Sequence, residues 1–570
     1  MLSAAKQDAI PEPTENEQPA NASRLKWSFC LVAICLGAVL AWAGDSYQGD
    51  AVSYLDMGDR FFAGDRTAIV NGLWSPLFPF VQGLARWVVK PSMRWEPTVF
   101  QVTNWLIFVT TVISFQFFWG TVLQLYKRLT VAQEQERCAI LSDRAFWVLG
   151  YTIFLFMHLD LVTAGTPDML LSTCVYLAAS FTLQFRLRRP ALRTSCLMGL
   201  ALGLGYLTKA IMLPLAGLFL VAATFGRVQW RRTALYTTVS LLIFAAVASP
   251  YVFALSKKLG HFTTGESGSL NYAFHVNAIP FTNWQGGPSR LGAPLHPTRE
   301  VFSSPPVYEF ATPSSGTYPP WDDPFYWNEG YQVSFNWADQ LSTLKPNLLA
   351  YFRLLQTQAA LIAGILILLA MRGSARTVVR NYFEVWYIWA PALLAFAAYA
   401  AVWVEGRYLA QFFVLFWAAA VTLVRLPDRN ESRRLLRCVC VVVVILMNIR
   451  TITLLPKNAV SRHHHSEEQV HIAESIAEAG IHRGEKLAVV GSSLADGWQK
   501  LSGVSVVAEI SADDADQFWV SGESQRARVF EAFAKTGATV AIAEEIPRWA
   551  LTPGWERVGA TSVYIHPLNR

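Results

Sequence analysis

Four charged residues stand at the edges of apolar stretches and could together do chemistry: Asp50, Asp168, Lys209 and Arg407. A charged group at the edge of a membrane is costly to desolvate, and for that reason it indicates function. A carboxylate can take the proton from a hydroxyl group, while Lys and Arg can neutralise the negative charge that grows on a departing phosphate. Two acids and two bases therefore suit a transfer reaction on an anionic lipid, provided that the fold brings them to one membrane face.

Each of these residues also has a simpler explanation. The Lys209 side chain could only extend to the lipid headgroups, and Arg407 could only pair with Glu405 or with a lipid phosphate. Asp168 could cap a helix, since TPD before an apolar run is typical of a helix start. For Asp50 we favour function, whereas we expect the other acids of the same stretch to form a solvated acidic surface; these are Asp45, Asp56, Asp59 and Asp65.

The composition places these residues in a membrane protein. Of the 570 residues, 53% are hydrophobic and 15% are charged, values typical of a polytopic membrane chain. The net charge of +6 comes from basic residues in loops beside the apolar runs, so nucleic acid binding is not expected. A span needs about 20 apolar residues, and most of the following runs qualify at once: 25–43, 98–125, 145–160, 169–185, 194–226, 233–254, 348–371, 383–403, 408–424 and 435–454.

Basic residues in the short loops predict the orientation of the spans. The loops on one side hold 19 Lys and Arg residues, whereas the two short connections on the other side, 161–168 and 404–408, hold only Arg407. This bias alternates consistently only if residues 194–226 form a hairpin, with Lys209 at its tip. The pattern then predicts eleven crossings, with the N-terminus in the cytoplasm and the C-terminus outside, and it places all four charged residues on the outer side.

The predicted fold is a mainly α, polytopic membrane protein with two external loops that carry short helices and a small C-terminal α/β domain. We expect residues 1–25 to be a disordered cytoplasmic segment and residues 26–455 to form the transmembrane domain. Within that domain, the first external loop at 45–97 should carry two helices along the membrane surface, and a long external loop covers 256–347. Residues 456–570, in which helical and β-rich stretches alternate, should form the extracytoplasmic α/β domain.

The long external loop is rich in aromatic residues, Pro and Gly, and it includes TYPPWDDPFYWNEG at 317–330. A loop of this length suits a lid or a binding loop, although its aromatic residues could equally be interfacial anchors. The triplet at 463–465, three His residues, could bind a metal, but we favour a solvated linker. The candidates for contact with a substrate are Tyr54 and Trp74 of the first loop, and His261, Trp327 and Glu329 of the long loop.

The order of several short motifs resembles a known family. Asp50 and Tyr54 follow the first span, and WSPLFP (74–79), TPD (166–168), GLGYLTKA (203–210) and EGRYL (405–409) come after them in that order. Over residues 26–425 this series resembles the GT-C superfamily of integral membrane glycosyltransferases, in the branch with protein O-mannosyltransferases and lipid A aminoarabinose transferases. Many relatives carry two adjacent acids at the first site, whereas Ala51 follows Asp50 here. A metal site built from such a pair is therefore not expected.

The resemblance implies an enzyme that moves a sugar from a polyprenyl-phosphate donor to an acceptor outside the cytoplasmic membrane, with inversion at the anomeric carbon. By motif, Asp50 would be the general base, Asp168 would orient the acceptor or support Asp50, and Lys209 and Arg407 would hold the donor phosphate. This scheme requires no cofactor, and it leaves a divalent metal open. The implied location is the bacterial cytoplasmic (inner) membrane, among membrane lipids; the acceptor could be a glycan, a lipid or a protein.

Two other functions remain open at this stage. A transporter or flippase for a lipid-linked sugar would also be a polytopic bundle, but it predicts ionisable groups and broken helices near the membrane midplane. A polymerase or ligase of surface polysaccharide would use diphosphate donors, which call for more Arg residues at the site than the sequence offers. The four charges are predicted to lie at one membrane face, and this distribution favours the glycosyltransferase.

Overall fold

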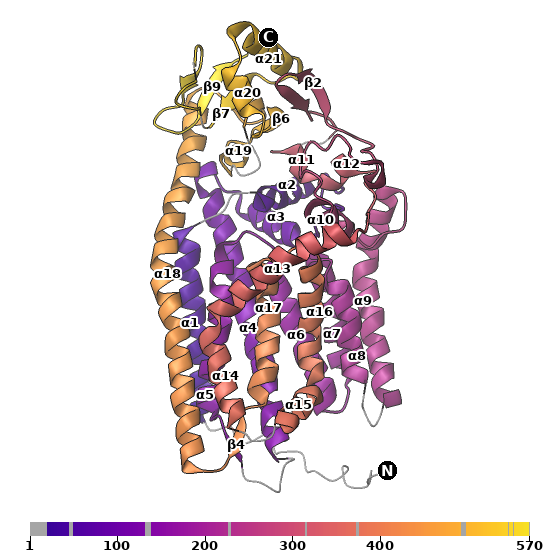
Figure 1. Cartoon of the computed structure of the whole chain (residues 1–570), viewed down its shortest axis with the longest axis vertical. Coiled ribbons are helices and arrows are strands. Elements are labelled where there is room, and N and C mark those ends of the chain that lie inside the picture. Colours follow the sequence, from indigo (N-terminus) through magenta and orange to yellow (C-terminus); the bar gives the residue numbers. More distant parts are fainter. Residues whose placement is uncertain are drawn as a thin grey trace.

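Long helices form a bundle, and a smaller unit with a β-sheet covers one end of it (Figure 1). The computed structural model describes residues 20–44, 49–131, 138–225, 230–313, 316–371, 375–491, 497–544, 546–550 and 552–568. The chain is mainly helical, as expected. Residues 1–19, most of the segment predicted to be disordered, lie outside the described residues. Helix α1 begins at Ala20, earlier than the first span was predicted to begin.

Six helices of the described residues are long and apolar enough to cross a membrane, or up to eight if each of two bent pairs is one span. The six lie in α1 (Ala20–Ala43), α4 (Glu96–Val131), α5 (Asp143–His158), α6 (Asp168–Leu187), α9 (Trp230–Leu259) and α18 (Asn430–Glu478). The bent pairs are α13 (Trp337–Thr357) with α14 (Ala359–Ala370), at 73°, and α15 (Ala375–Glu384) with α16 (Trp386–Ala401), at 85°. Shorter helices of the bundle are α7 (Leu192–Thr208), α8 (Met212–Thr224) and α17 (Gly406–Thr422).

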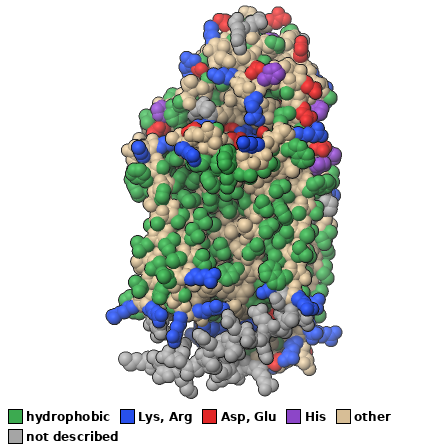
Figure 2. Space-filling model, turned by 180° about the vertical axis from the view of Figure 1, so that it is seen from behind, with side chains coloured by type: hydrophobic (Ala, Val, Ile, Leu, Met, Phe, Trp, Pro, Cys, Tyr) green, Lys and Arg blue, Asp and Glu red, His purple; other side chains and the backbone are tan. Residues whose placement is uncertain are grey.

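An apolar surface covers the face of the bundle that is seen in Figure 2. Figure 2 shows hydrophobic side chains over its middle, with charged side chains on the sheet-bearing side and Lys and Arg gathered at the opposite end. Large apolar side chains such as Leu242, Phe253 and Ile445 are more than half exposed on α9 and α18. Soluble proteins rarely expose continuous apolar surface of this extent. The apolar surface and the apolar helices together indicate a multi-pass membrane protein.

Two short helices, α2 (Asp50–Phe62) and α3 (Leu77–Val89), lie between the bundle and the sheet unit (Figure 1). They cross where Gly58 faces Gly83. A Cβ atom on Gly58 would lie 2.5 Å from the carbonyl oxygen of Pro79, and one on Gly83 would lie 2.7 Å from the Gly58 backbone. Only glycine permits backbones to approach this closely. The crossing fixes α2 against α3, and with it the position of Asp50 at the start of α2.

The seven-stranded sheet has the order β2-β3-β6-β5-β7-β9-β8. Its centre is parallel, because β5 pairs in parallel with both β6 and β7. Residues 456–570, the tail, supply five strands, and the long external loop supplies the β2–β3 hairpin, which pairs antiparallel with β6. The sequence did not indicate that these two regions share a sheet. The strands are β2 (Arg299–Ser303), β3 (Pro306–Glu309), β5 (Lys486–Val490), β6 (Ser505–Ile510), β7 (Val540–Ala543), β8 (Glu556–Arg557) and β9 (Tyr564–Pro567).

Helix α18 connects the bundle to the sheet unit without a break. Its 49 residues extend on the order of 70 Å, about twice the thickness of a bilayer core. The helix therefore runs through residue 456, where the sequence suggested a domain boundary.

The remaining elements are η1 (Met93–Trp95), β1 (Cys138–Ile140), η2 (Leu159–Thr163), α10 (Ser267–His275), η3 (Ser289–Leu291), α11 (Pro319–Asp322), α12 (Pro324–Asn328), β4 (Arg425–Pro427), α19 (Gly497–Ser502), α20 (Ala515–Val520) and α21 (Glu523–Lys535).

Candidate active site

The four charged residues singled out in the sequence all lie at helix ends. Asp50 and Asp168 are the first residues of α2 and α6. Lys209 directly follows α7, in the break before α8, and Arg407 is the second residue of α17. The break at Lys209 agrees with the predicted tip of a hairpin. Because each residue ends or starts a helix, its side chain can turn across the end of the bundle toward the others.

Asp50 is held through both of its carboxylate oxygens. Nη2 of Arg407 donates a hydrogen bond to Oδ2 at 3.2 Å, and Nε1 of Trp321 donates one to Oδ1 at 3.3 Å. Arg407 also pairs with Glu405, with 3.0 Å between Nε and Oε2. The Asp50 side chain remains 26% exposed. It is therefore oriented by two donors and still accessible, as a group that receives a proton from a substrate must be.

Asp168 and Lys209 form the second acid–base pair. Nζ of Lys209 lies 2.6 Å from Oδ1 of Asp168, and the Thr166 hydroxyl donates to Oδ2 at 2.9 Å. Asp168 is 1% exposed, whereas the Lys209 side chain is 24% exposed. The carboxylate is thus enclosed by its partners, and the partly exposed ammonium is the member of the pair that a ligand can reach.

The ring of Tyr408 joins the two pairs. Nζ of Lys209 lies 3.7 Å from the ring centroid, and the guanidinium carbon of Arg407 lies 5.0 Å from it. Nη2 of Arg407 also donates to the Tyr408 hydroxyl at 3.2 Å. Aromatic faces attract cations, so the ring keeps two positive charges together where they would otherwise repel. A cationic pair that includes a guanidinium suits an anion with several oxygens, such as a phosphate.

Tyr54 and Trp74 lie beneath this site rather than at its surface. They are 4% and 8% exposed, and their rings meet edge to face at 5.1 Å. Trp74 packs in the same way on Trp321, with 5.6 Å between the centroids. Both predicted substrate residues therefore support the Trp321 ring that contacts Asp50.

The other three substrate candidates have partners away from Asp50 and Lys209. His261 is near Glu266, with 3.4 Å between Nε2 and Oε1, and Glu329 pairs with His296 at 3.1 Å. Nε1 of Trp327 donates to the carbonyl oxygen of Pro319 at 3.0 Å. The described contacts of these side chains do not include the four charged residues.

The expectation of a solvated acidic surface is wrong for Asp56. This side chain is 5% exposed, and Oδ1 lies 2.5 Å from Nζ of Lys500. Asp59 contacts the same ammonium at 2.8 Å and Arg86 at 2.9 Å. Burial opposes ionisation of Asp59, but the two cations outweigh it and lower its pKa. Asp65 is partly exposed and pairs with Arg60, and Asp45 lies outside the described residues.

A third buried acid, Asp322, lies close to this ion-pair cluster. It is 3% exposed, and in the described part of the chain neither of its carboxylate oxygens has a hydrogen-bond partner. Burial is the main cause that raises its pKa well above the ordinary value, and the nearby charge of Asp56 raises it further. Both effects favour the protonated form of this carboxyl group.

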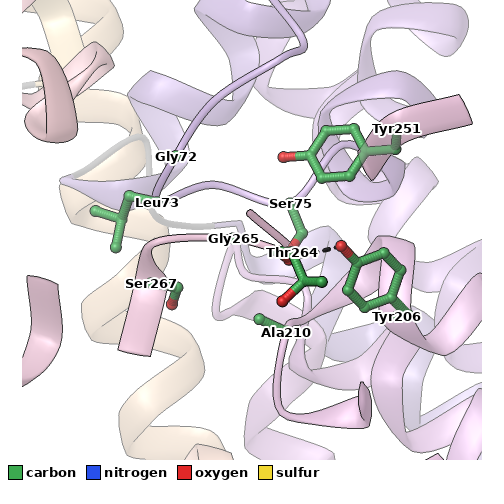
Figure 3. Close-up of a pocket in the computed structure, with 9 residues that line it drawn as sticks. All are labelled: Gly72, Leu73, Ser75, Tyr206, Ala210, Tyr251, Thr264, Gly265 and Ser267. Atoms are coloured by element: carbon green, nitrogen blue, oxygen red, sulfur yellow. Dashed lines mark hydrogen bonds between the residues drawn. The ribbon is translucent and has the colours of Figure 1, made fainter. Parts of the chain in front are cut away.

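A small pocket lies beside the Lys209 break, between the first loop, the long loop and the ends of α7 and α9. Figure 3 shows the Tyr206 hydroxyl pointing at Thr264, to whose carbonyl oxygen it donates at 2.6 Å. The pocket is lined by Gly72, Leu73, Ser75, Tyr206, Ala210, Tyr251, Thr264, Gly265 and Ser267. None of the four charged residues lines it, so it adjoins the candidate site without forming part of it.

Among the described residues, no group of three or more His, Cys, Asp or Glu side chains is arranged to hold a metal ion. The triplet His463–His465 lies within helix α18, where His463 approaches Glu467 at 3.3 Å. The acids of the site have protein cations as partners, since Asp50 and Glu405 pair with Arg407 and Asp168 pairs with Lys209.

Two residues of the site, Trp321 and Tyr408, were missed by reasoning from the sequence. Both lie inside stretches that drew attention for other reasons, since Trp321 belongs to TYPPWDD and Tyr408 follows Arg407 in EGRYL. An aromatic residue next to a cation is a weak signal of cation–π pairing. The contact of Trp321 with Asp50 joins positions 271 residues apart, and no local pattern predicts such a contact.

No protein-family model matches the chain, and no curated protein sequence matches it. Its structure is similar to the crystal structure of ArnT from Cupriavidus metallidurans bound to undecaprenyl phosphate. That alignment has a TM-score of 0.55 and 14% identity, and it covers 95% of this chain and 98% of that one. Archaeoglobus fulgidus AglB, an archaeal oligosaccharyltransferase in complex with an inhibitory peptide and a dolichol-phosphate, aligns with a TM-score of 0.47 and 10% identity over 92% and 69% of the two chains. The likeness to ArnT, which extends over nearly the whole of both chains, shows that the two chains share their fold.

Proposed function

We propose that this protein is a glycosyltransferase that moves a sugar from a polyprenyl-phosphate donor to an acceptor at the outer side of the bacterial cytoplasmic membrane. One observation carries the proposal. Two acid–cation pairs, Asp50 with Arg407 and Asp168 with Lys209, meet at the ring of Tyr408. A base and a phosphate site side by side are what the displacement of a lipid phosphate by a hydroxyl requires.

Lys209 and Arg407 would bind the donor phosphate. Their side chains are 24% and 22% exposed, so a ligand can reach them without unfolding the site. In the transfer step the bond between the anomeric carbon and the phosphate oxygen breaks, and negative charge grows on that oxygen. Two cations already in contact with the phosphate stabilise this charge as it grows, which lowers the barrier.

Asp50 would act as the general base. Once the phosphate engages Arg407, Oδ2 of Asp50 is released to accept the proton of the acceptor hydroxyl, while Trp321 continues to hold Oδ1. The acceptor oxygen then forms the new bond to the anomeric carbon from the side opposite the phosphate. This single displacement inverts the configuration, and polyprenyl phosphate leaves with the electron pair of the broken bond.

Asp168 would keep Lys209 charged and in place. A carboxylate that is 1% exposed has no room for an acceptor, so of its two implied roles the structure favours support over contact with the acceptor. Removal of its charge would leave the ammonium free to swing toward solvent. The phosphate site therefore depends on Asp168, although Asp168 itself does not touch the donor.

The fold supports this assignment. The ArnT structure with which this chain shares its fold contains undecaprenyl phosphate, a polyprenyl phosphate of the proposed class. Because 14% identity transfers the fold alone, the residues of this chain have to account for binding themselves, and Lys209 and Arg407 are the cations placed to do so.

The topology that goes with this function has eleven crossings. The six long helices, the two bent pairs, and α7, α8 and α17 make up that number, with residues 1–25 in the cytoplasm. Residues 26–455 are the transmembrane domain and 456–570 the extracytoplasmic domain, to which the β2–β3 hairpin of the long loop adds two strands. The basic loops would then face the cytoplasm, and the candidate site would open outward, beneath the sheet unit.

The function is tested by comparing the lipid-linked sugars of cells that produce the protein or its Asp50→Asn variant. A donor that the active protein consumes should accumulate as a polyprenyl-phosphate sugar when Asp50 is replaced, and its mass would identify the sugar. Identical profiles in both strains would contradict the proposal. A transporter would move the lipid without consuming it, and a diphosphate donor would accumulate if the protein were a polymerase or ligase.

A further inference from the structure

The segment Thr317–Asp322 of the long external loop lies along one face of α2. Asp50, Ser53 and Asp56 are spaced three residues apart and so share that face. Asp50 accepts from the Trp321 indole at 3.3 Å, the Ser53 hydroxyl donates to the Trp321 carbonyl oxygen at 3.0 Å, and Asp56 accepts from the Thr317 amide at 2.7 Å. The segment is thus fastened to the helix at three successive positions.

The first loop also holds the segment from the side. Nε1 of Trp74 donates to the carbonyl oxygen of Trp321 at 3.0 Å, and the Asn71 amide donates to that of Asp322 at 2.7 Å. The Trp321 ring is 9% exposed and packs against Trp74, Phe274 and Phe281 at centroid distances of 5.6, 6.2 and 5.8 Å. Such a ring cannot change rotamer without moving its neighbours.

The sheet of the tail forms hydrogen bonds with the other end of the same segment. The Tyr318 hydroxyl lies 2.9 Å from both carboxylate oxygens of Glu509 on β6, and the Val506 amide donates to the carbonyl oxygen of Thr317 at 2.9 Å. Glu509 is 2% exposed and also accepts from Asn283 at 2.6 Å. A continuous series of contacts therefore runs from the tail sheet through Tyr318 and Trp321 to Asp50.

We propose that Trp321 is a positioning residue for Asp50, and that the tail sheet sets its place through the contact between Tyr318 and Glu509. The inference rests on the proposed role of Asp50 as the base. Without the indole N–H on Oδ1, the carboxylate can turn both oxygens toward Arg407, because bidentate pairing with a guanidinium is the favoured geometry. Asp50 would then present no oxygen to the acceptor. In this account the tail is needed for a correctly arranged active site, because it positions Trp321 and through it Asp50.

The test measures the reactivity of Asp50 in the purified full-length protein without substrate. A water-soluble carbodiimide with glycine ethyl ester modifies accessible carboxyl groups, and peptide mass spectrometry gives the rate at each residue. Trp321→Phe keeps an apolar ring and removes the N–H, and Ser53→Ala is a milder change that removes one of the two side-chain hydrogen bonds to the Trp321 carbonyl oxygen. Tyr318→Phe and Glu509→Gln alter the tail contact. Asp65, which is partly exposed, is the reference in every sample.

We expect the modification rate of Asp50 to change by about tenfold in Trp321→Phe, the effect of losing one hydrogen bond to a charged group, and by less in the other three variants. The rate at Asp65 should stay constant. Matched controls are Trp337→Phe, an exposed Trp of the same loop, and Tyr308→Phe, whose backbone lies opposite Glu509 in the sheet. Neither control should alter the rate at Asp50.

An unchanged rate at Asp50 in both Trp321→Phe and Ser53→Ala would overturn the positioning role. An unchanged rate in both Tyr318→Phe and Glu509→Gln would overturn the role of the tail. Neither result depends on catalysis, because the labelling needs no donor. Failure of the proposed function would show instead as normal consumption of the lipid-linked sugar by Asp50→Asn.

Discussion

The ammonium of Lys209, in the break between α7 and α8, lies 2.6 Å from the carboxylate of Asp168 at the start of α6. The acid is buried and the base is partly exposed, so the pair presents its positive end to a ligand. The same ammonium lies over Tyr408, beside Arg407. A single ion pair between two helix ends thereby builds half of the proposed phosphate site.

Asp50→Asn should reduce transfer by at least about a hundredfold, since a general base contributes between 10² and 10⁴ to the rate. The amide can still accept from Trp321, so folding and lipid binding should persist. Consumption of the lipid-linked sugar, thermal unfolding in detergent and undecaprenyl phosphate binding are the three measurements. Asp65→Asn, on the same loop, is the control and should behave as the unmodified protein. Normal turnover by Asp50→Asn would remove Asp50 from the mechanism.

Lys209→Met should weaken binding of undecaprenyl phosphate and also destabilise the protein, because it leaves Asp168 buried without its cation. The double variant Asp168→Asn, Lys209→Met removes both charges and should recover stability without recovering binding. Native mass spectrometry gives the bound fraction and thermal unfolding gives the stability. Lys257→Ala, an exposed lysine at the end of α9, should bind normally. Full binding of undecaprenyl phosphate by the double variant would contradict the role of Lys209 in the phosphate site and leave it only a contact with lipid headgroups.

Lys500→Met should loosen the sheet unit from the first loop. The Lys500 ammonium is the shared partner of Asp56 and Asp59, and removal of one member of a buried ion pair costs about 3–5 kcal/mol. Limited proteolysis of the tail and thermal unfolding report the loss. Lys535→Met removes an exposed lysine that is 72% accessible, and it should cost little. Equal stability of both variants would show that the buried pair does not hold the tail in place.

Much of this arrangement could be predicted because each signal is local. Asp50, Asp168, Lys209 and Arg407 are charges at the ends of apolar runs, and the basic loops require a hairpin whose tip is Lys209. The partners that orient them are not local. Trp321 reaches Asp50 from 271 positions away, and Lys500 reaches Asp56 from 444. A single sequence contains no pattern for such pairs, and this is why Asp56 was expected to be solvated.

The position of the β2–β3 hairpin in the sheet also could not be predicted from the sequence. Its strands are short, and β3 pairs with β6, which lies far along the sequence in the tail. Alternation of polar and apolar residues can predict a strand, but not its partner. The apolar pattern likewise ended at residue 454, inside α18, because the second half of that helix is polar and leads to the sheet unit.

Glu509 should make stability depend on pH. Burial raises its pKa from the ordinary 4.5 to about 7, although hydrogen bonds from Tyr318 and Asn283 act in the opposite direction. The folded state therefore binds more protons than the unfolded state between these values. The stabilisation is fully present below pH 4.5 and is lost as the pH rises through 7, by about 3 kcal/mol in total.

Glu509→Gln keeps the neutral form at every pH, so the difference in unfolding temperature between this variant and the unmodified protein should grow from pH 5 to pH 8 in favour of the variant. Glu531→Gln, at a fully exposed acid on α21, is the control and should give a much smaller dependence. A difference that does not vary with pH would mean that Glu509 is already ionised at pH 5.

The most direct measurement is an experimental structure of the protein with undecaprenyl phosphate bound. The account predicts the phosphate within hydrogen-bond distance of both Lys209 Nζ and the Arg407 guanidinium, with Oδ2 of Asp50 released toward the place of the acceptor. A phosphate bound elsewhere, with the pairs of Asp50 with Arg407 and Asp168 with Lys209 still closed, would contradict it.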